Sequence, residues 1–229
     1  MSGAGALELI VRGDPALLAI VRLSLLVTVS ATALASLIGL PAGALLALAR
    51  FPGRTALVVA INGLMGLPPV VVGLAVFLLL SRSGPLGSLG LLFTPTAMVL
   101  AQALLITPII VALTRQTIEA LWEEYSEELS AMGVSRGSAV ATLLWDLRFP
   151  LVTILLAGFG RAAAEVGAVI MVGGNIDGFT RVMTTSIALE TSKGNLDLAI
   201  GLGLVLIGLV LAVNALAWGV RQWAGAHAG

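Results

Sequence analysis

Charged residues are scarce in this sequence and cysteine is missing altogether. Only 10% of the 229 residues are Asp, Glu, Lys or Arg, and none is cysteine. Because a soluble globular domain has about 25% charged residues, a surface that faces water on all sides is excluded. The absence of cysteine also excludes disulfides and thiolate metal sites, although it does not decide a cellular compartment.

The chain also lacks the residues that several enzyme classes need. It has no G-x-x-x-x-G-K-[ST] loop for nucleotide phosphates, so any ATP hydrolysis has to come from another chain. Its single histidine, His227, lies in the C-terminal AGAHAG, so the apolar segments offer no Ser/His or metal constellation to a hydrolase. The net charge of zero does not suggest nucleic-acid binding. The N-terminal MSGAGALELIVRGDP lacks the pattern of a removable signal peptide.

The sequence contains several long stretches with few or no ionisable side chains. Residues 23–49, 55–81, 91–114 and 198–220 contain none, and residues 149–176 contain only Arg161 and Glu165. Each stretch exceeds the roughly 18–20 apolar residues that cross a bilayer as a helix, and hydrocarbon offers backbone amides no other partner. We therefore predict an all-α polytopic transmembrane helical bundle, formed as a single domain over residues 1–229. The predicted spans are about 17–48, 55–81, 92–118, 141–173 and 196–223, with a charged connection at about 119–140.

The direction of the chain and the role of its prolines stay open at this point. Five spans place the termini on opposite sides, and a cytoplasmic turn at 49–55 gives that side only a slight excess of Lys and Arg. The prolines inside apolar spans are either ordinary kinks or points where helices open around a pathway. They are Pro41, Pro68, Pro69 and Pro108.

The charged connection carries a family pattern. EELSAMG, residues 127–133, resembles the signature loop of bacterial ABC importer permeases, in which an acid and two alanines are followed after three residues by glycine. Glu127 matches the acid and Gly133 the glycine, while Glu128 and Leu129 replace the alanines. The family's downstream proline pattern would end at residue 146, which is Asp146 here.

A short amphipathic cytoplasmic helix in this connection could dock in a groove of a partner protein, with Gly133 ending its first turn. The alternative is an ordinary solvated loop with an acidic face. The resemblance implies that ATPase coupling is carried by Glu124, Glu127, Glu128, Ala131, Gly133, Ser135 and Arg136.

A second resemblance covers residues 158–194. This segment is similar to the corresponding region of tungstate importer permeases and, more loosely, to that of molybdate and sulfate permeases, where a G-E-F-G-A-type run follows an arginine. Here Arg161 is followed by Glu165-Val166-Gly167-Ala168. With LMGLPPVVVG at 64–73 and a length near 230, the resemblance extends over nearly the whole chain. It implies a small oxyanion as cargo, tungstate first, with molybdate or sulfate as alternatives.

Arg161 and Glu165 are the only ionisable residues well inside a predicted span. They are four residues apart, so they share one helix face and can pair. A central arginine costs about 2.5–3.5 kcal/mol on translocon scales, which argues against a position facing lipid. One interpretation is structural: the pair bridges helices or fixes register across a dimer. The other is functional: the pair gates the anion path, and Glu165 weakens the attraction of Arg161 so that the anion is not held too tightly. We favour a paired element at the gate that combines both roles.

The segment from Gly173 to Gly194 is rich in hydroxyl groups and glycines, which can recognise oxyanions through neutral donors. The alternative is a plain external loop with hydroxyl-rich helix caps. We assign the predicted translocation gate to Arg161, Glu165, Thr184, Thr185, Ser186 and Glu190, with no metal site.

The resemblance also implies an assembly and a mechanism. The implied mechanism is alternating access by a homodimer in a bacterial or archaeal cytoplasmic membrane. The implied partners are two cytoplasmic ATPase subunits, which bind ATP and Mg, and an extracytoplasmic oxyanion-binding protein. No cofactor is expected in this chain. The alternative from a different class is a stand-alone secondary carrier or channel, which five spans without an internal repeat do not favour.

Overall fold

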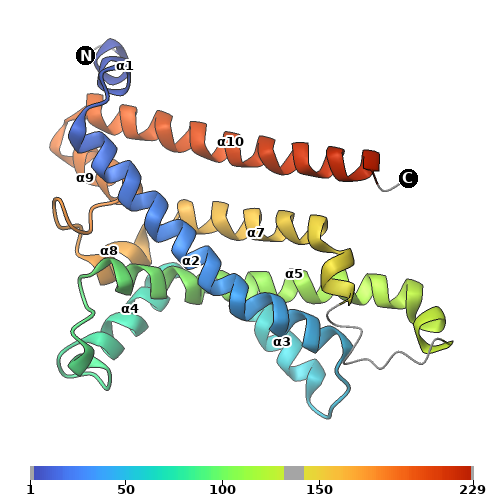
Figure 1. Cartoon of the computed structure of the whole chain (residues 1–229). Helices are drawn as coiled ribbons and strands as arrows, with labels where there is room; N and C mark the ends of the chain where they lie inside the picture. The colour runs from blue at the N-terminus through green and yellow to red at the C-terminus, as the bar shows by residue number, and fades with distance from the viewer. Residues whose placement is uncertain (1–2, 132–141, 228–229) are drawn as a thin grey trace.

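The computed structural model describes residues 3–131 and 142–227, and the long regular elements in these ranges are α-helices (Figure 1). The predicted all-α polytopic bundle is confirmed. The elements are α1 (Gly3–Arg12), α2 (Pro15–Leu48), α3 (Arg54–Leu64), α4 (Pro69–Leu80), the short 3-10 helix η1 (Gly87–Leu89), α5 (Pro95–Ala131), α7 (Arg148–Ala163), α8 (Gly167–Gly173), α9 (Met183–Lys193) and α10 (Leu196–His227).

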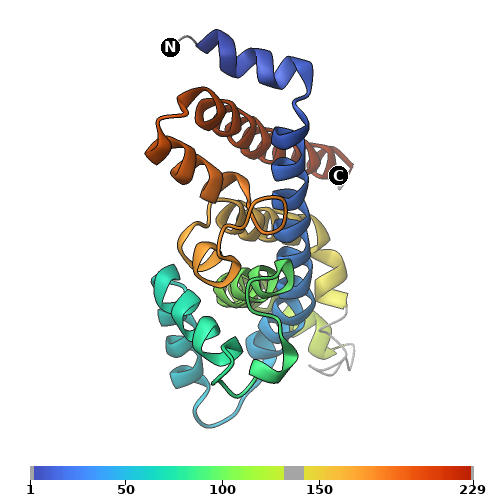
Figure 2. The same ribbon diagram turned by 90° about the vertical axis from the view of Figure 1, so that its left-hand side faces the viewer.

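The long helices are arranged in tiers. Helices α10, α7 and α5 run alongside one another, and α2 crosses them at an angle (Figures 1 and 2). Helices α2, α5 and α10 are each long and apolar enough to cross a membrane. The pairs α3–α4 and α7–α8 meet the same test when each pair is taken as one bent span, which gives up to five spans among the described residues.

Two of the predicted helices are broken. The segment expected at 55–81 bends by 101° between α3 and α4, and the segment expected at 141–173 bends by 61° between α7 and α8. At the first break, Pro68 and Pro69 cannot donate backbone hydrogen bonds, and a residue before proline avoids the helical conformation. The second break contains no proline, and the side chains that support it are described with the site below.

The third predicted span is longer than expected. Helix α5 continues past residue 118 to Ala131, so the first part of the predicted charged connection is a direct extension of the spanning helix. The rest of that connection, residues 132–141, lies outside the described residues. At about 1.5 Å of rise per residue, the 37 residues of α5 exceed a hydrocarbon core of about 30 Å.

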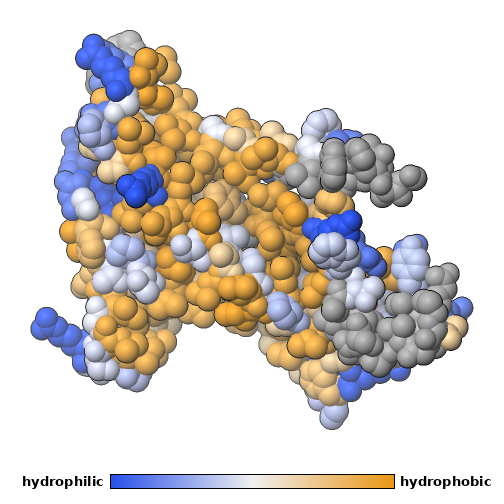
Figure 3. Space-filling model, viewed as in Figure 1, coloured by the Kyte–Doolittle hydropathy of each residue, from blue (hydrophilic) through white to orange (hydrophobic). Residues whose placement is uncertain are grey.

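The two ends of the bundle differ. The α7–α8 bend, α9 and the start of α10 lie at the end that carries the N-terminus (Figure 1). The ends of α5 and α10 and the start of α7 lie at the opposite end (Figure 1). Between them the surface is largely apolar (Figure 3), and Leu37 and Leu211 are 75% and 64% exposed. An apolar surface of this extent is what lipid covers.

Helices α2 and α5 pack closely because glycines of α2 leave space for α5. A Cβ atom at Gly39 would lie 2.8 Å from Cγ2 of Ile110. A Cβ atom at Gly43 would lie 2.6 Å from the carbonyl oxygen of Val111 and 2.8 Å from Cβ of Thr114. The Gly39-x-x-x-Gly43 spacing is therefore used for one particular contact, a role that small residues commonly take between membrane helices.

This contact predicts that Gly43→Ala destabilises the protein. The new methyl group would press on the backbone of α5, which cannot yield as a side chain can, and overpacking of this kind costs about 1–3 kcal/mol. The measurement is the midpoint of thermal unfolding in detergent. Gly208→Ala in α10 is the matched control, because a Cβ atom there meets nothing within 4 Å. Equal stability of the two variants would contradict the close α2–α5 contact.

Candidate functional site

The bend between α7 and α8 holds the ion pair that the sequence singled out. Nη1 of Arg161 lies 2.9 Å from Oε2 of Glu165. The side chain of Glu165 is only 3% exposed, whereas that of Arg161 is 36% exposed. The pair therefore has a buried anion and a partly accessible cation, so the positive end is the end that a solute can approach.

Glu165 also supports the bend itself. Its second carboxylate oxygen, Oε1, accepts a hydrogen bond of 3.0 Å from the backbone amide of Ala168, in the first turn of α8. The first amides of a helix have no partner within the helix, and a carboxylate is favourable near their partial positive charge. One side chain thus pairs with Arg161 and supports the start of the next helix.

Side chains from two other helices bind carbonyl groups at the same bend. Nε2 of Gln102, on α5, donates to the carbonyl of Ala162 at 3.0 Å. The hydroxyl of Thr184, on α9, donates to the carbonyl of Glu165 at 2.8 Å. Backbone groups released by a broken membrane helix need such partners. The bend is therefore fixed from both sides, by α5 and by α9.

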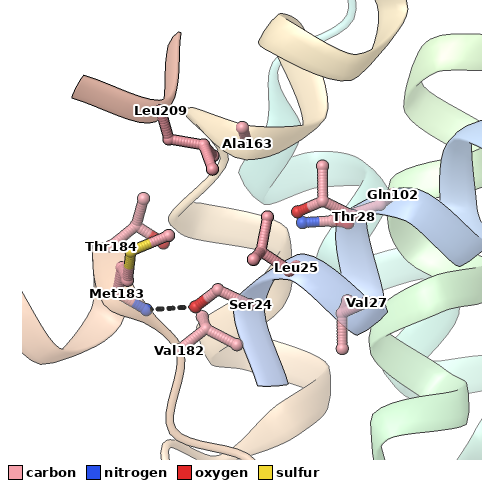
Figure 4. Close-up of a pocket in the computed structure, with 10 residues that line it drawn as sticks. All are labelled: Ser24, Leu25, Val27, Thr28, Gln102, Ala163, Val182, Met183, Thr184 and Leu209. Atoms are coloured by element: carbon pink, nitrogen blue, oxygen red, sulfur yellow. Dashed lines mark hydrogen bonds between the residues drawn. The ribbon is translucent and has the colours of Figure 1, made fainter. Parts of the chain in front are cut away.

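A small cavity lined by both polar and apolar side chains lies beside this bend (Figure 4). Its volume is about 10 Å³, which is close to the minimum that one water molecule requires. Ser24 lies in its wall and accepts a hydrogen bond of 2.7 Å from the backbone amide of Met183, the first residue of α9. Thr28, Gln102 and Thr184 add further polar groups around it. Helix α9 is thus tied to α2 as well as to the bend.

The structure separates some residues that the sequence grouped into one gate. Thr184 joins the Arg161–Glu165 pair through the carbonyl of Glu165. Thr185 instead caps its own helix, because its hydroxyl accepts from the amide of Val182 at 3.2 Å. The hydroxyl of Ser186 is buried and has no hydrogen-bond partner among the described residues. Only Thr184 among these three hydroxyl groups therefore bonds to the bend.

Glu190 lies in the last turn of α9, just before the connection to α10. Its carboxylate accepts hydrogen bonds from Lys193 at 3.1 Å and from Asn195 at 2.9 Å. These two hydrogen bonds, first that of Lys193, hold the pKa of Glu190 below its ordinary value, and the charges of Lys193 and Arg181 act in the same direction against burial. These contacts join the end of α9 to the connection with α10.

The predicted coupling residues lie on and beyond the end of α5. Glu124 and Glu127 are exposed there, as is Ala131, the last residue of the helix. Glu128 lies in the same helical stretch. Gly133, Ser135 and Arg136 lie outside the described residues, so the structure says nothing of their positions. The part that is described is an acidic helix end carried on a spanning helix.

An ionic cluster precedes this helix end and was not found from the sequence. Glu119 of α5 pairs with Arg115, one turn before it, and with Arg54, the first residue of α3. A groove of about 300 Å³ runs beside the cluster, lined also by Arg50 and Glu123. The described residues contain no group of three or more His, Cys, Asp or Glu side chains that could hold a metal ion.

Comparison with known proteins shows where the chain belongs. The family described as binding-protein-dependent transport system inner membrane component matches residues 39–223. A probable anion ABC transporter permease protein of Haloferax volcanii is 42% identical over 205 residues, 87% of this chain and 88% of the relative. A tungstate uptake system permease protein of Peptoclostridium acidaminophilum is 39% identical over 217 residues, 95% of each chain. A sulfate transport system permease protein of Escherichia coli is 28% identical over 214 residues, 89% of this chain and 77% of the relative.

The family match covers most of the chain, and two of these relatives are similar over nearly their full length. The resemblance to ABC importer permeases that the sequence indicated is therefore confirmed. The chain belongs to the inner membrane components of binding-protein-dependent transport systems, and it is a multi-pass ABC transporter permease.

Proposed function

We propose that this permease moves tungstate into the cytoplasm as part of an ATP-driven importer. The observation that carries the proposal is the 39% identity to a tungstate uptake permease over 95% of both chains. Molybdate and sulfate are the alternative anions, since they share the tetrahedral shape and double negative charge of tungstate. The similarity to a sulfate permease is lower, at 28%.

The proposed assembly is a homodimer of this chain in the cytoplasmic membrane of a bacterium or archaeon. Two ATPase subunits, which bind ATP and Mg, would dock on the cytoplasmic side at the acidic end of α5. Exposed Glu124 and Glu127 support this location, because charged groups on a projecting helix suit a docking element. A soluble oxyanion-binding protein would deliver its cargo to the opposite end of the bundle.

Two segments at that opposite end would form the outer mouth. They are the turn around η1 and the stretch from Gly173 to Lys193. The amide of Phe93, which follows η1, donates to the carbonyl of Val172 at 2.8 Å, so the two segments meet at their edges. Both lie at the end that carries α8 and α9 (Figure 1).

The proposed gate is the α7–α8 bend. Arg161 offers a partly exposed positive charge to a passing anion, and the buried Glu165 limits the strength of that attraction. In alternating access, ATP-driven movement of the ATPase subunits would open the path outward, and hydrolysis would reset it inward. The cavity beside the bend, at about 10 Å³, is far too small to hold an oxyanion.

We predict ATP-dependent tungstate uptake by proteoliposomes that contain this permease, its co-purifying ATPase and the loaded binding protein. Uptake is measured as tungsten retained inside the vesicles, and calorimetry gives the ligand preference of the binding protein. Tungstate should bind more tightly than molybdate and sulfate. Uptake by the permease alone would instead identify a stand-alone carrier or channel, and equal binding of sulfate would contradict tungstate as the cargo.

We predict that Arg161→Ala abolishes uptake while the complex still assembles. Removal of Arg161 takes away the attracting charge and leaves the buried Glu165 without its cation. The loss of one partner costs about 3–5 kcal/mol when both are fully buried. The cost is lower here, because Arg161 is 36% exposed. Assembly is checked by size-exclusion chromatography and uptake by retained tungsten.

The double variant Arg161→Met with Glu165→Gln separates gating from folding. It removes both charges, yet the amide oxygen of the introduced glutamine can still accept from the backbone amide of Ala168. A stable double variant without uptake supports a role in the anion path. A double variant with near-normal uptake would show that the pair serves only the structure of the bend.

A further inference from the structure

We infer that Arg54 is a positioning residue that passes the movement of the coupling end of α5 to the α3–α4 span and so to the gate. This inference rests on the proposed function, because it assumes that an ATPase acts on the end of α5. Arg54 was not assigned a role by the sequence. Its contacts join three helices at the end of the bundle where the ATPase would dock.

Arg54 first binds the end of α2. Its Nε donates to the carbonyl of Leu46 at 3.0 Å, and its Nη2 lies 3.4 Å from the carbonyl of Ala47. The last carbonyls of a helix have no partner within the helix, and a cation there is favourable for the helix dipole. The guanidinium group of Arg54, the first residue of α3, thus caps the C-terminal end of α2.

The same guanidinium group reaches α5. Its Nη2 pairs with Oε1 of Glu119, whose other oxygen pairs with Arg115. The side chains of Arg54 and Glu119 are 28% and 27% exposed, so solvent screens the pair less than it screens a surface pair. Glu119 lies five residues before Glu124 on the same helix, so a rotation of the coupling end of α5 would displace it directly.

Helix α3 depends on this contact more than its neighbours do. None of its residues is buried, whereas α4 buries Val72, Gly73, Val76 and Leu80. The start of α3 is held by the bonds of Arg54, and its other end leads through the 101° bend into α4. We therefore expect a displacement at the start of α3 to be passed along the helix to α4.

Helix α4 carries the displacement to the gate. A Cβ atom at Gly73 would lie 2.7 Å from Cα of Ala168, so α4 and α8 touch through their backbones. Ala168 is the residue whose amide binds Glu165. The route from Glu119 through Arg54, α3 and α4 to Ala168 is thus an unbroken series of contacts between the docking end and the ion pair. Perturbing these contacts tests whether they carry the coupling.

The test compares Arg54→Gln with Arg50→Gln in the complete complex of permease, ATPase and loaded binding protein. Arg50 lines the same groove but makes no hydrogen bond or ion pair within the part of the chain that the structure describes. We expect both complexes to assemble and hydrolyse ATP. Tungstate taken up per ATP hydrolysed should fall at least about fivefold in Arg54→Gln, the lower end of typical coupling between sites, and stay near normal in Arg50→Gln.

Two milder variants protect the test against a folding defect. Arg54→Lys keeps the charge but lacks the forked guanidinium that binds the Leu46 carbonyl and Glu119 at the same time. Glu119→Gln keeps a hydrogen-bond acceptor without the charge. Each should lower uptake per ATP by less than Arg54→Gln does. Unchanged uptake per ATP in all three variants, or loss of the ATPase from all three, would overturn the inference. Absence of ATP-dependent uptake in the unaltered complex would count against the proposed function instead.

A distance measurement gives a readout that does not depend on transport. Because the chain has no cysteine, spin labels can be attached through Val59→Cys on α3 and Gln116→Cys on α5, both at exposed positions. We expect a narrow distance distribution that broadens in Arg54→Gln and not in Arg50→Gln. A distribution unaffected by Arg54→Gln would show that α3 is held by other contacts.

Discussion

A helix that bends inside a membrane releases backbone groups that hydrocarbon cannot satisfy, and the centre of this permease is organised around that constraint. At the α7–α8 bend the carboxylate of Glu165 binds an amide of α8 and the guanidinium of Arg161. Gln102 and Thr184 bind two carbonyls of the same bend from α5 and α9. The bend is therefore supported by side chains from several helices.

The long-range partners of the bend explain what sequence analysis could and could not predict. Apolar length predicted five spans, where the described residues give three unbroken ones and up to five if each bent pair is one span, and the spacing of Arg161 and Glu165 predicted a pair that the structure contains. Gln102 is the only amide side chain of the apolar stretch 91–114, but its partner lies 60 residues away. Ser24 binds the start of α9 across 159 residues, and Arg54 meets Glu119 across 65. No local pattern encodes such separations.

The residues of the predicted gate do not all contact the bend, for the same reason. Composition grouped Thr184, Thr185, Ser186 and Glu190, because all four are polar residues in one short segment. In a helix, successive residues point in different directions, so only Thr184 bonds to the bend, while Thr185 caps α9 and Glu190 binds its neighbours in the turn to α10. The kink at Pro68 and Pro69 could be anticipated from proline chemistry, but the proline-free bend at Glu165 could not.

At the proposed gate, the balance of charge would suit passage of an anion better than its storage. A dianion about 4 Å from a lone cation would gain roughly 8 kcal/mol at an effective dielectric constant of about 20. That gain corresponds to an affinity increase of about a million-fold, and so tight a complex would release its cargo slowly. With Glu165 buried at 2.9 Å from Arg161, much of this attraction is cancelled, while the exposed part of the arginine still favours an approaching anion. In the proposed importer, which a separate binding protein would supply, such weak attraction would be enough, because selection would take place before the anion reaches the membrane.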